Sequence, residues 1–163
     1  MEDWNLRKAI ELAITTEQMG ADFYARLERK FGDQPELKEV FARLVKDEKA
    51  HEAQFKAILD RLPDDVDQKR DYEQWQFLRA TAISEFFRED AFKDTDRIDS
   101  IENALGRALS FEKSTLQYYQ AIRDLIGASP QLDDIIEAER GHVVGLMRVI
   151  VADGKFRGVG DKF

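Results

Sequence analysis

The only two histidines of this 163-residue chain each follow a glutamate by three residues, as Glu48–His51 and Glu139–His142. Residues three apart lie on one face of an α-helix, so each pair directs both side chains the same way. Two further glutamates, Glu17 and Glu112, occur singly within other segments of helical periodicity. The pattern constrains the chain to a fold in which several helices present these polar side chains together.

Apolar residues spaced by three and four positions predict four long helices. Capping residues and prolines indicate where they begin, and glycines indicate where they end. The expected ranges are about 4–31, about 35–62, about 101–126 and about 130–153, with Asp33, Asp99 or Ser100, and Ser129 as candidate starts and Gly32, Gly127 and Gly154 as expected ends.

One long connection, residues 63–99, separates the second helix from the third. Its stretch from Tyr72 to Arg88 is expected to form an extra helix, and about seventeen residues at 1.5 Å each span roughly 25 Å, enough to return along a bundle. The predicted fold is therefore all-α: an antiparallel four-helix bundle of two hairpins joined by one long crossover, a ferritin-like connectivity. Residues 1–153 are expected to form a single domain, followed by a glycine-rich tail, 154–163.

An internal repeat supports two equivalent hairpins. Glu17 and Tyr24 match Glu112 and Tyr119 at a constant offset, and the Glu-x-x-His of the second helix matches that of the fourth. Each hairpin thus supplies one single glutamate and one Glu-x-x-His pair. All of these positions lie near the middle of a helix, so antiparallel packing is expected to bring them to one level.

Energetics favour a metal centre at that level. Burying one unpaired carboxylate costs several kcal/mol or raises its pKa until it is protonated, and four carboxylates would also repel each other. Lys49, Lys113 and Arg140 point about 100° away from their neighbouring ligands and are poor counter-ions. Two divalent cations would neutralise the four carboxylates, with the imidazoles as neutral ligands. Oxygen-rich ligands with two nitrogens favour iron, with manganese as an alternative and zinc as a substitute.

A structural interpretation competes with this one. A single glutamate such as Glu17 or Glu112 in a helical stripe is usually an exposed edge residue, whereas the symmetric set of six is hard to explain without a shared site. Tyr24 and Tyr119 lie two turns beyond the single glutamates, where a phenol could hydrogen-bond a ligating carboxylate. They could equally be core tyrosines with hydroxyl groups satisfied elsewhere.

Charge and composition exclude several classes of function. The net charge of −8 disfavours nucleic acid or an anionic membrane as the main partner. No apolar run approaches the length of a membrane span, and the first residues lack the features of a signal peptide, so a cytoplasmic location is expected. The absence of cysteine excludes an iron–sulfur cluster.

At these residues the chain resembles the rubrerythrin and bacterioferritin branch of the ferritin-like di-iron superfamily, over roughly residues 4 to 153. By this resemblance two irons would be held by six residues, with Glu48 and Glu139 bridging. The strings that carry the resemblance are Glu17-Gln-Met-Gly-Ala-Asp-Phe-Tyr24, Asp47-Glu-Lys-Ala-His51, Glu112-Lys-Ser-Thr-Leu-Gln-Tyr-Tyr119 and Glu139-Arg-Gly-His142, and the implied ligands are Glu17, Glu48, His51, Glu112, Glu139 and His142.

The resemblance also implies an activity. Such proteins oxidise ferrous iron with hydrogen peroxide or dioxygen and protect cells from oxidative stress or handle iron. Rubrerythrins typically carry a cysteine-bearing rubredoxin domain, so a chain without cysteine is expected to use a separate electron donor protein. Thr115 stands where rubrerythrins place an additional glutamate, and Lys49 stands where bacterioferritins place a haem-ligating methionine, so no haem is expected.

Three functions therefore remain open. The favoured hypothesis is a di-iron oxidoreductase of the peroxidase or ferroxidase type. The alternatives are a non-catalytic iron-binding or storage protein and a metal-free helical interaction module. Helix faces outside the core are expected to pair two chains into a homodimer.

Overall fold

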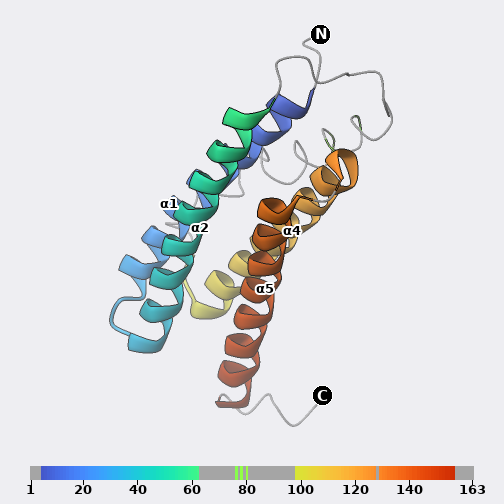
Figure 1. Cartoon of the computed structure of the whole chain (residues 1–163). Helices are drawn as coiled ribbons and strands as arrows, with labels where there is room; N and C mark the ends of the chain where they lie inside the picture. The colour runs from blue at the N-terminus through green and yellow to red at the C-terminus, as the bar shows by residue number, and fades with distance from the viewer. Residues whose placement is uncertain are drawn as a thin grey trace.

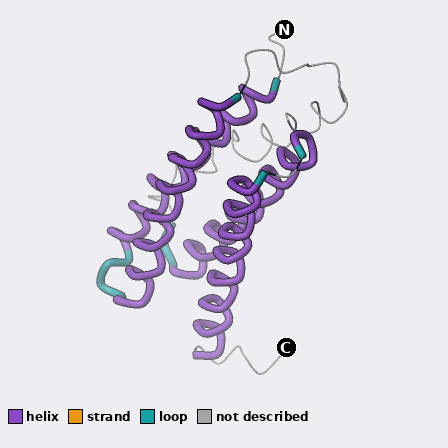
Figure 2. Tube along the Cα trace, viewed as in Figure 1, coloured by secondary structure: helices purple, strands orange, loops and turns teal. Residues whose placement is uncertain are grey.

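A computed structural model describes residues 5–62, 76, 78, 80, 98–127 and 129–156 of the chain. Within these ranges the protein consists of four long helices without β-strands, which confirms the expected all-α architecture (Figures 1 and 2). The helices are α1 (Leu6–Lys30), α2 (Pro35–Arg61), α4 (Ile101–Ile126) and α5 (Pro130–Phe156).

The helix starts follow ordinary capping chemistry. The side chain of Asn5 accepts a hydrogen bond from the Lys8 amide at 2.9 Å, and that of Ser100 accepts one from the Asn103 amide at 3.2 Å. These contacts satisfy backbone N–H groups that lack partners within the first helical turn. Pro35 and Pro130 occupy the first positions of α2 and α5, as expected.

Three predicted boundaries are wrong. Helix α1 ends at Lys30 with Phe31 as its cap, not Gly32, because the Phe31 amide still donates to the Leu27 carbonyl. The N-cap of α2 is Gln34 rather than Asp33. Helix α5 continues past Gly154 to Phe156, since glycine weakens a helix without blocking its hydrogen bonds. Gly127 does end α4, with a φ of 84° that favours glycine.

The four helices form two hairpins that pack face to face. Helix α1 contacts α2 and α4, and α5 contacts α4 and α2, so α1 lies diagonally opposite α5. Helix α2 ends at one end of the bundle and α4 begins at the opposite end, as a long crossover requires (Figure 1). The described part therefore agrees with a ferritin-like bundle.

The predicted crossover helix lies almost entirely outside the described residues. Of that stretch only Gln76, Leu78 and Ala80 are described, and the extra helix stays a prediction. Leu78 is fully buried and belongs to the hydrophobic core. Of the predicted tail, 154–163, the first three residues belong to α5, and residues 157–163 lie outside the described ranges. None of the described helices has an apolar stretch long enough to span a bilayer.

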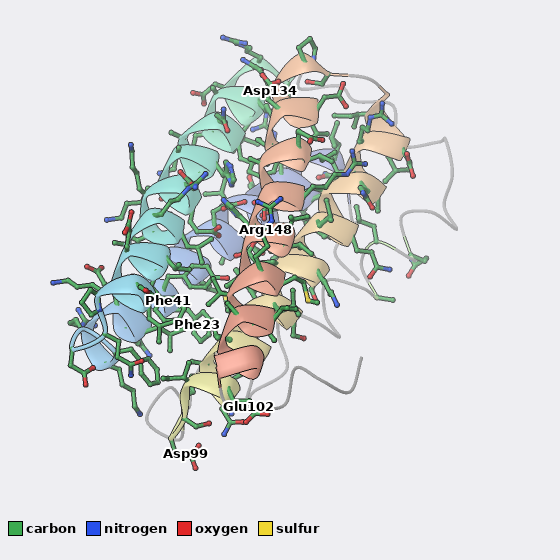
Figure 3. All side chains as sticks on the ribbon, turned by 90° about the horizontal axis from the view of Figure 1, so that it is seen from below. Phe23, Phe41, Asp99, Glu102, Asp134 and Arg148 are labelled. Carbon is green, nitrogen blue, oxygen red and sulfur yellow. The ribbon has the colours of Figure 1, made fainter. Side chains whose placement is uncertain are left out.

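Leucine, isoleucine and aromatic side chains fill the space between the helices above and below a central polar layer. Phe23 and Phe41 point between the helices, while the charged side chains of Asp134 and Arg148 are exposed (Figure 3). Burial of apolar surface at about 25 cal/mol per Å² is the main force that holds such a bundle together. Among the described residues, the buried polar side chains are Thr16, Glu17, Glu48, His51, Glu112, Thr115, Glu139 and His142.

Candidate metal centre

All six residues predicted as ligands lie in the central polar layer. Helices α1 and α4 each contribute one glutamate, and α2 and α5 each contribute one Glu-x-x-His pair. None of the six residues is more than 7% exposed, although glutamate and histidine are seldom buried without partners. Lys49, Lys113 and Arg140 are exposed, as expected for residues that point away from the interior.

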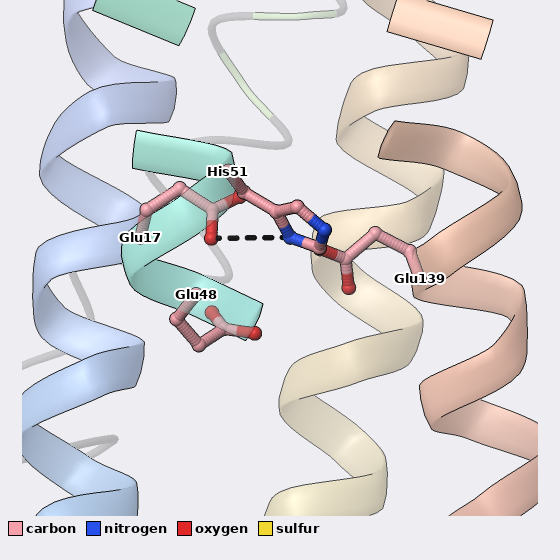
Figure 4. A group of neighbouring side chains, drawn as sticks. All are labelled: Glu17, Glu48, His51 and Glu139. Carbon is pink, nitrogen blue, oxygen red and sulfur yellow. Dashed lines mark ion pairs between the residues drawn. The ribbon is translucent and has the colours of Figure 1, made fainter. Parts of the chain in front are cut away.

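The six side chains form two overlapping groups, in each of which one nitrogen or oxygen atom per residue lies within 4.8 Å of the others. Glu48 and Glu139 belong to both groups, as bridging ligands would. Figure 4 shows the first group, with side chains from α1, α2 and α5 directed toward one another. The groups are Glu17, Glu48, His51 and Glu139, and Glu48, Glu112, Glu139 and His142. We call them the His51 subsite and the His142 subsite.

Each imidazole faces the carboxylates through Nδ1. In the His51 subsite, Nδ1 of His51 lies 2.8 Å from Oε1 of Glu139 and 3.7 Å from Oε2 of Glu17. In the His142 subsite, Nδ1 of His142 lies 3.2 Å from Oε2 of Glu112 and 3.6 Å from Oε1 of Glu48. The two rings are 5.5 Å apart between centroids. Their lone pairs can therefore serve two adjacent cations.

Several of these buried atoms are unsatisfied by the protein. Oε2 of Glu17, Oε1 of Glu48, Oε1 of Glu139 and Nδ1 of His51 have no hydrogen bond of acceptable geometry with any described residue. The close approach of His51 to Glu139 is thus an ion-pair contact without hydrogen-bond alignment. Buried polar atoms almost always have a partner, so unsatisfied atoms that converge on one point need another. Divalent cations fit this oxygen-rich set with two nitrogens.

Three of the glutamates have raised pKa values in the metal-free protein. Burial raises the pKa of Glu48 well above its ordinary value, and the charges of Glu17 and Glu112 raise it further. Burial also raises the pKa of Glu17. Burial and the charge of Glu139 raise the pKa of Glu112 to about 8. The layer therefore retains protons on its carboxyl groups when no cation neutralises it.

The remaining three groups, Glu139, His51 and His142, form a set of ion pairs. Burial favours protonated Glu139, but the close polar contacts of this carboxyl with the His142 and His51 imidazoles outweigh burial and hold its pKa below its ordinary value. Burial lowers the pKa of both imidazoles, yet the carboxylates prevail. Glu139 and Glu17 raise the pKa of His51 to about 9, and Glu112 and Glu139 raise that of His142 to about 11.

The two tyrosines singled out in the sequence contact candidate ligands across the bundle. Tyr24 on α1 donates a hydrogen bond to Glu112 on α4, and Tyr119 on α4 donates one to Glu17 on α1. Both rings are fully buried, and burial followed by the nearby carboxylate raises the pKa of each phenol. Each tyrosine therefore stays protonated and can orient the glutamate of the opposite hairpin.

Small residues shape the space beside the single glutamates. A Cβ at Gly20 would overlap Oε2 of Glu48 and lie 2.7 Å from the Phe111 ring, so glycine leaves room for that carboxylate. The repeat-equivalent residue, Thr115, donates a hydrogen bond to the Glu112 carbonyl at 3.0 Å and lies 3.4 Å from Oε2 of Glu139.

One residue at the centre was missed in the sequence. Oδ2 of Asp47 lies 3.3 Å from Nε2 of His142, on the ring edge opposite the carboxylates. The available signal was its position immediately before Glu48, which places it about 100° around the helix from that ligand candidate. That this side of α2 faces α5 is seen only in the structure.

Four helices that present four carboxylates and two imidazoles as two overlapping groups define a bundle able to hold a dinuclear metal centre. The rubrerythrin family model matches residues 8–150, most of the chain. The protein therefore belongs to the rubrerythrin family, a branch of the ferritin-like di-iron superfamily, and the expected membership is confirmed. Comparisons with curated proteins and with solved structures gave no match.

Proposed function

We propose that the protein is a non-haem di-iron oxidoreductase that oxidises ferrous iron with hydrogen peroxide or dioxygen. The observation that supports it best is the convergence of six buried ligand-type side chains, several of them unsatisfied, in a member of the rubrerythrin family. When bound, two ferrous ions would supply two electrons, which with two protons reduce one hydrogen peroxide to two waters.

In this proposal each candidate ligand is assigned to one or both of two metal ions. Glu17 and His51 would hold one ion, Glu112 and His142 would hold the other, and Glu48 and Glu139, which belong to both groups, would be shared between them. Iron is the proposed metal because oxygen-rich sites with two imidazoles suit it, with manganese or zinc as substitutes. A separate protein that returns electrons to the centre is part of the proposal.

The residues around the proposed metal ions limit contact with bulk water and determine where protons are held. The ligands are almost fully buried, so reaction would take place away from bulk water, where electrostatic interactions are stronger. Tyr24 and Tyr119 keep their protons and direct Glu112 and Glu17. Metal binding would displace the protons that the imidazoles and carboxyl groups hold in the metal-free protein.

Stopped-flow absorbance tests the proposal. Protein loaded anaerobically with ferrous iron is mixed separately with hydrogen peroxide and with dioxygen, and compared with a Glu17→Ala, Glu112→Ala variant. With at least one of the two oxidants, we expect the wild type to react at least about a hundredfold faster than this variant, since each substitution removes a proposed ligand. Glu39→Ala, an exposed glutamate on α2, is the matched control and should react like the wild type. Equal rates in all three proteins would contradict the proposal.

The same sample distinguishes iron storage. A storage protein would take up far more than two irons per chain and would elute from a size-exclusion column as a large assembly after loading. An oxidoreductase of the proposed kind should saturate at two irons per chain and keep its elution volume.

A further inference from the structure

The two imidazoles of the centre are supported unequally. Nδ1 of His142 faces the glutamates, while its Nε2 lies 3.3 Å from Oδ2 of Asp47. The same oxygen, Oδ2 of Asp47, also lies 3.5 Å from Nε of Arg43, one turn earlier on α2. A ring that offers the Nδ1 lone pair to a cation must carry its proton on Nε2, and that proton then points at the Asp47 carboxylate.

Within the described residues, the internal repeat shows this support at only one of the two histidines. The residues that match Glu48 and His51 are Glu139 and His142, so the position that matches Asp47 is Ala138. A methyl group cannot accept a hydrogen bond. In the described part of the chain, His51 contacts carboxylates only through Nδ1. The two subsites therefore have similar inner ligands but different outer contacts.

An outer carboxylate has two effects on a ligating histidine. It fixes the tautomer and ring orientation, and it makes the metal-facing nitrogen a better donor. Loss of such a partner typically costs ten- to a hundredfold in metal affinity. We propose that Asp47 is a positioning residue that makes the two metal subsites inequivalent, so that the His142 subsite binds its metal more tightly and fills before the His51 subsite. This inference rests on the proposed metal centre.

Titration calorimetry with Co²⁺ on the metal-free 163-residue chain tests this inference, with the visible absorption of cobalt as a second readout of coordination. Asp47→Ala removes the carboxylate, and Asp47→Asn keeps a hydrogen-bond acceptor without its charge. Asp60→Ala, an exposed aspartate on the same helix, is the matched control. Glu17→Gln and Glu112→Gln backgrounds identify the subsites, because Glu17 belongs only to the His51 subsite and Glu112 only to the His142 subsite.

We expect two binding steps in the wild type, the tighter of which weakens about ten- to a hundredfold in Asp47→Ala and less in Asp47→Asn. The loss should persist in the Glu17→Gln background and should be absent in the Glu112→Gln background, where only the His51 subsite is intact. Two unchanged binding constants in Asp47→Ala, or a loss confined to the Glu112→Gln background, would overturn the inference but leave the metal centre standing. A wild type that takes up no metal would overturn the proposed function as well.

Discussion

The hydroxyl group of Tyr24 on α1 donates a hydrogen bond to Oε1 of Glu112 on α4, so a residue of the first hairpin orients a candidate ligand of the second. Tyr119 and Glu17 form the reciprocal contact. The two hairpins are therefore joined at the centre by hydrogen bonds to the candidate ligands themselves. This arrangement couples the geometry of the candidate ligands to the packing of the two halves.

Removal of the Tyr24 hydroxyl is expected to weaken metal binding. Tyr24→Phe leaves Oε1 of Glu112 without its donor, and loss of such outer partners typically lowers metal affinity about ten- to a hundredfold. Tyr118→Phe is the matched control, because this neighbouring buried tyrosine donates instead to the Ala9 carbonyl at 3.0 Å. Calorimetric titration with ferrous iron should show a loss for Tyr24→Phe and wild-type affinity for Tyr118→Phe. Equal affinities in both variants would refute the role of Tyr24.

Addition of one methyl group at Gly20 is expected to displace Glu48. The new Cβ would overlap Oε2 of Glu48 and press on the Phe111 ring at 2.7 Å, so Gly20→Ala should lower both metal affinity and melting temperature. Gly106→Ala is the control, since nothing lies near its Cβ on the exposed face of α4. That substitution should stabilise the protein by about 0.5–1 kcal/mol, because alanine favours helix. A Gly20→Ala protein with normal metal affinity would show that Glu48 can move away freely.

Replacement of Glu48 by a neutral residue is expected to stabilise the metal-free protein while abolishing the proposed oxidoreductase activity. Burial holds the pKa of Glu48 well above its ordinary value, so the charged form of this carboxyl is disfavoured in the folded metal-free protein. Glu48→Gln removes that cost and should raise the free energy of unfolding by about 1–3 kcal/mol in urea denaturation without metal. Glu39→Gln, an exposed site on the same helix, should change it little. A destabilised Glu48→Gln protein would argue against an uncompensated carboxylate at this position.

The metal-free protein should lose stability as pH rises. The folded-state pKa values of His51 and His142 are raised to about 9 and about 11 from an unfolded value of 6.5, so their contribution is complete below 6.5 and disappears as pH passes these values. The raised pKa of Glu112, about 8 against 4.5, acts in the same direction between those two values. Urea denaturation from about pH 6 to about pH 10 should show a falling free energy of unfolding. A flat or rising profile would contradict these protonation states.

Metal uptake should release those same protons. At neutral pH the metal-free centre holds protons on both imidazoles and on Glu112, and ligands must lose them to coordinate. Calorimetric titrations in buffers of different ionisation enthalpy measure the number released. We expect release from His51, His142 and Glu112, and a smaller number in a His51→Ala variant. Uptake without proton release would mean that the metal binds elsewhere.

The sequence was sufficient for the four helices and for the convergence of the candidate ligands. Glu48 and His51 interrupt an apolar stripe at helical spacing, which indicates a helix with two polar residues on its buried face. The internal repeat places the matching pair at the equivalent position of another helix. The helical fold and the common height of the two pairs along the bundle therefore follow from periodicity. Gly32 was misjudged because its cap position depends on one backbone hydrogen bond, from Phe31 to Leu27.

Contacts between helices could not be read in the same way. That Tyr24 reaches Glu112 rather than Glu17 depends on how two hairpins pack, which periodicity along one helix does not specify. Asp47 was missed because its role is set by α5, the neighbouring helix that carries His142. Contacts of this kind arise from tertiary packing. The periodicity of one helix gives the position of a residue on that helix, but not the residue of another helix that it contacts.

The most direct test of the centre is an anomalous difference map at the iron absorption edge, from crystals of protein loaded anaerobically with ferrous iron. We expect two peaks per chain, both between Glu48 and Glu139, one beside Nδ1 of His51 and the other beside Nδ1 of His142. A map with no peak between these residues in fully loaded crystals would contradict the proposal that cations neutralise the buried carboxylates.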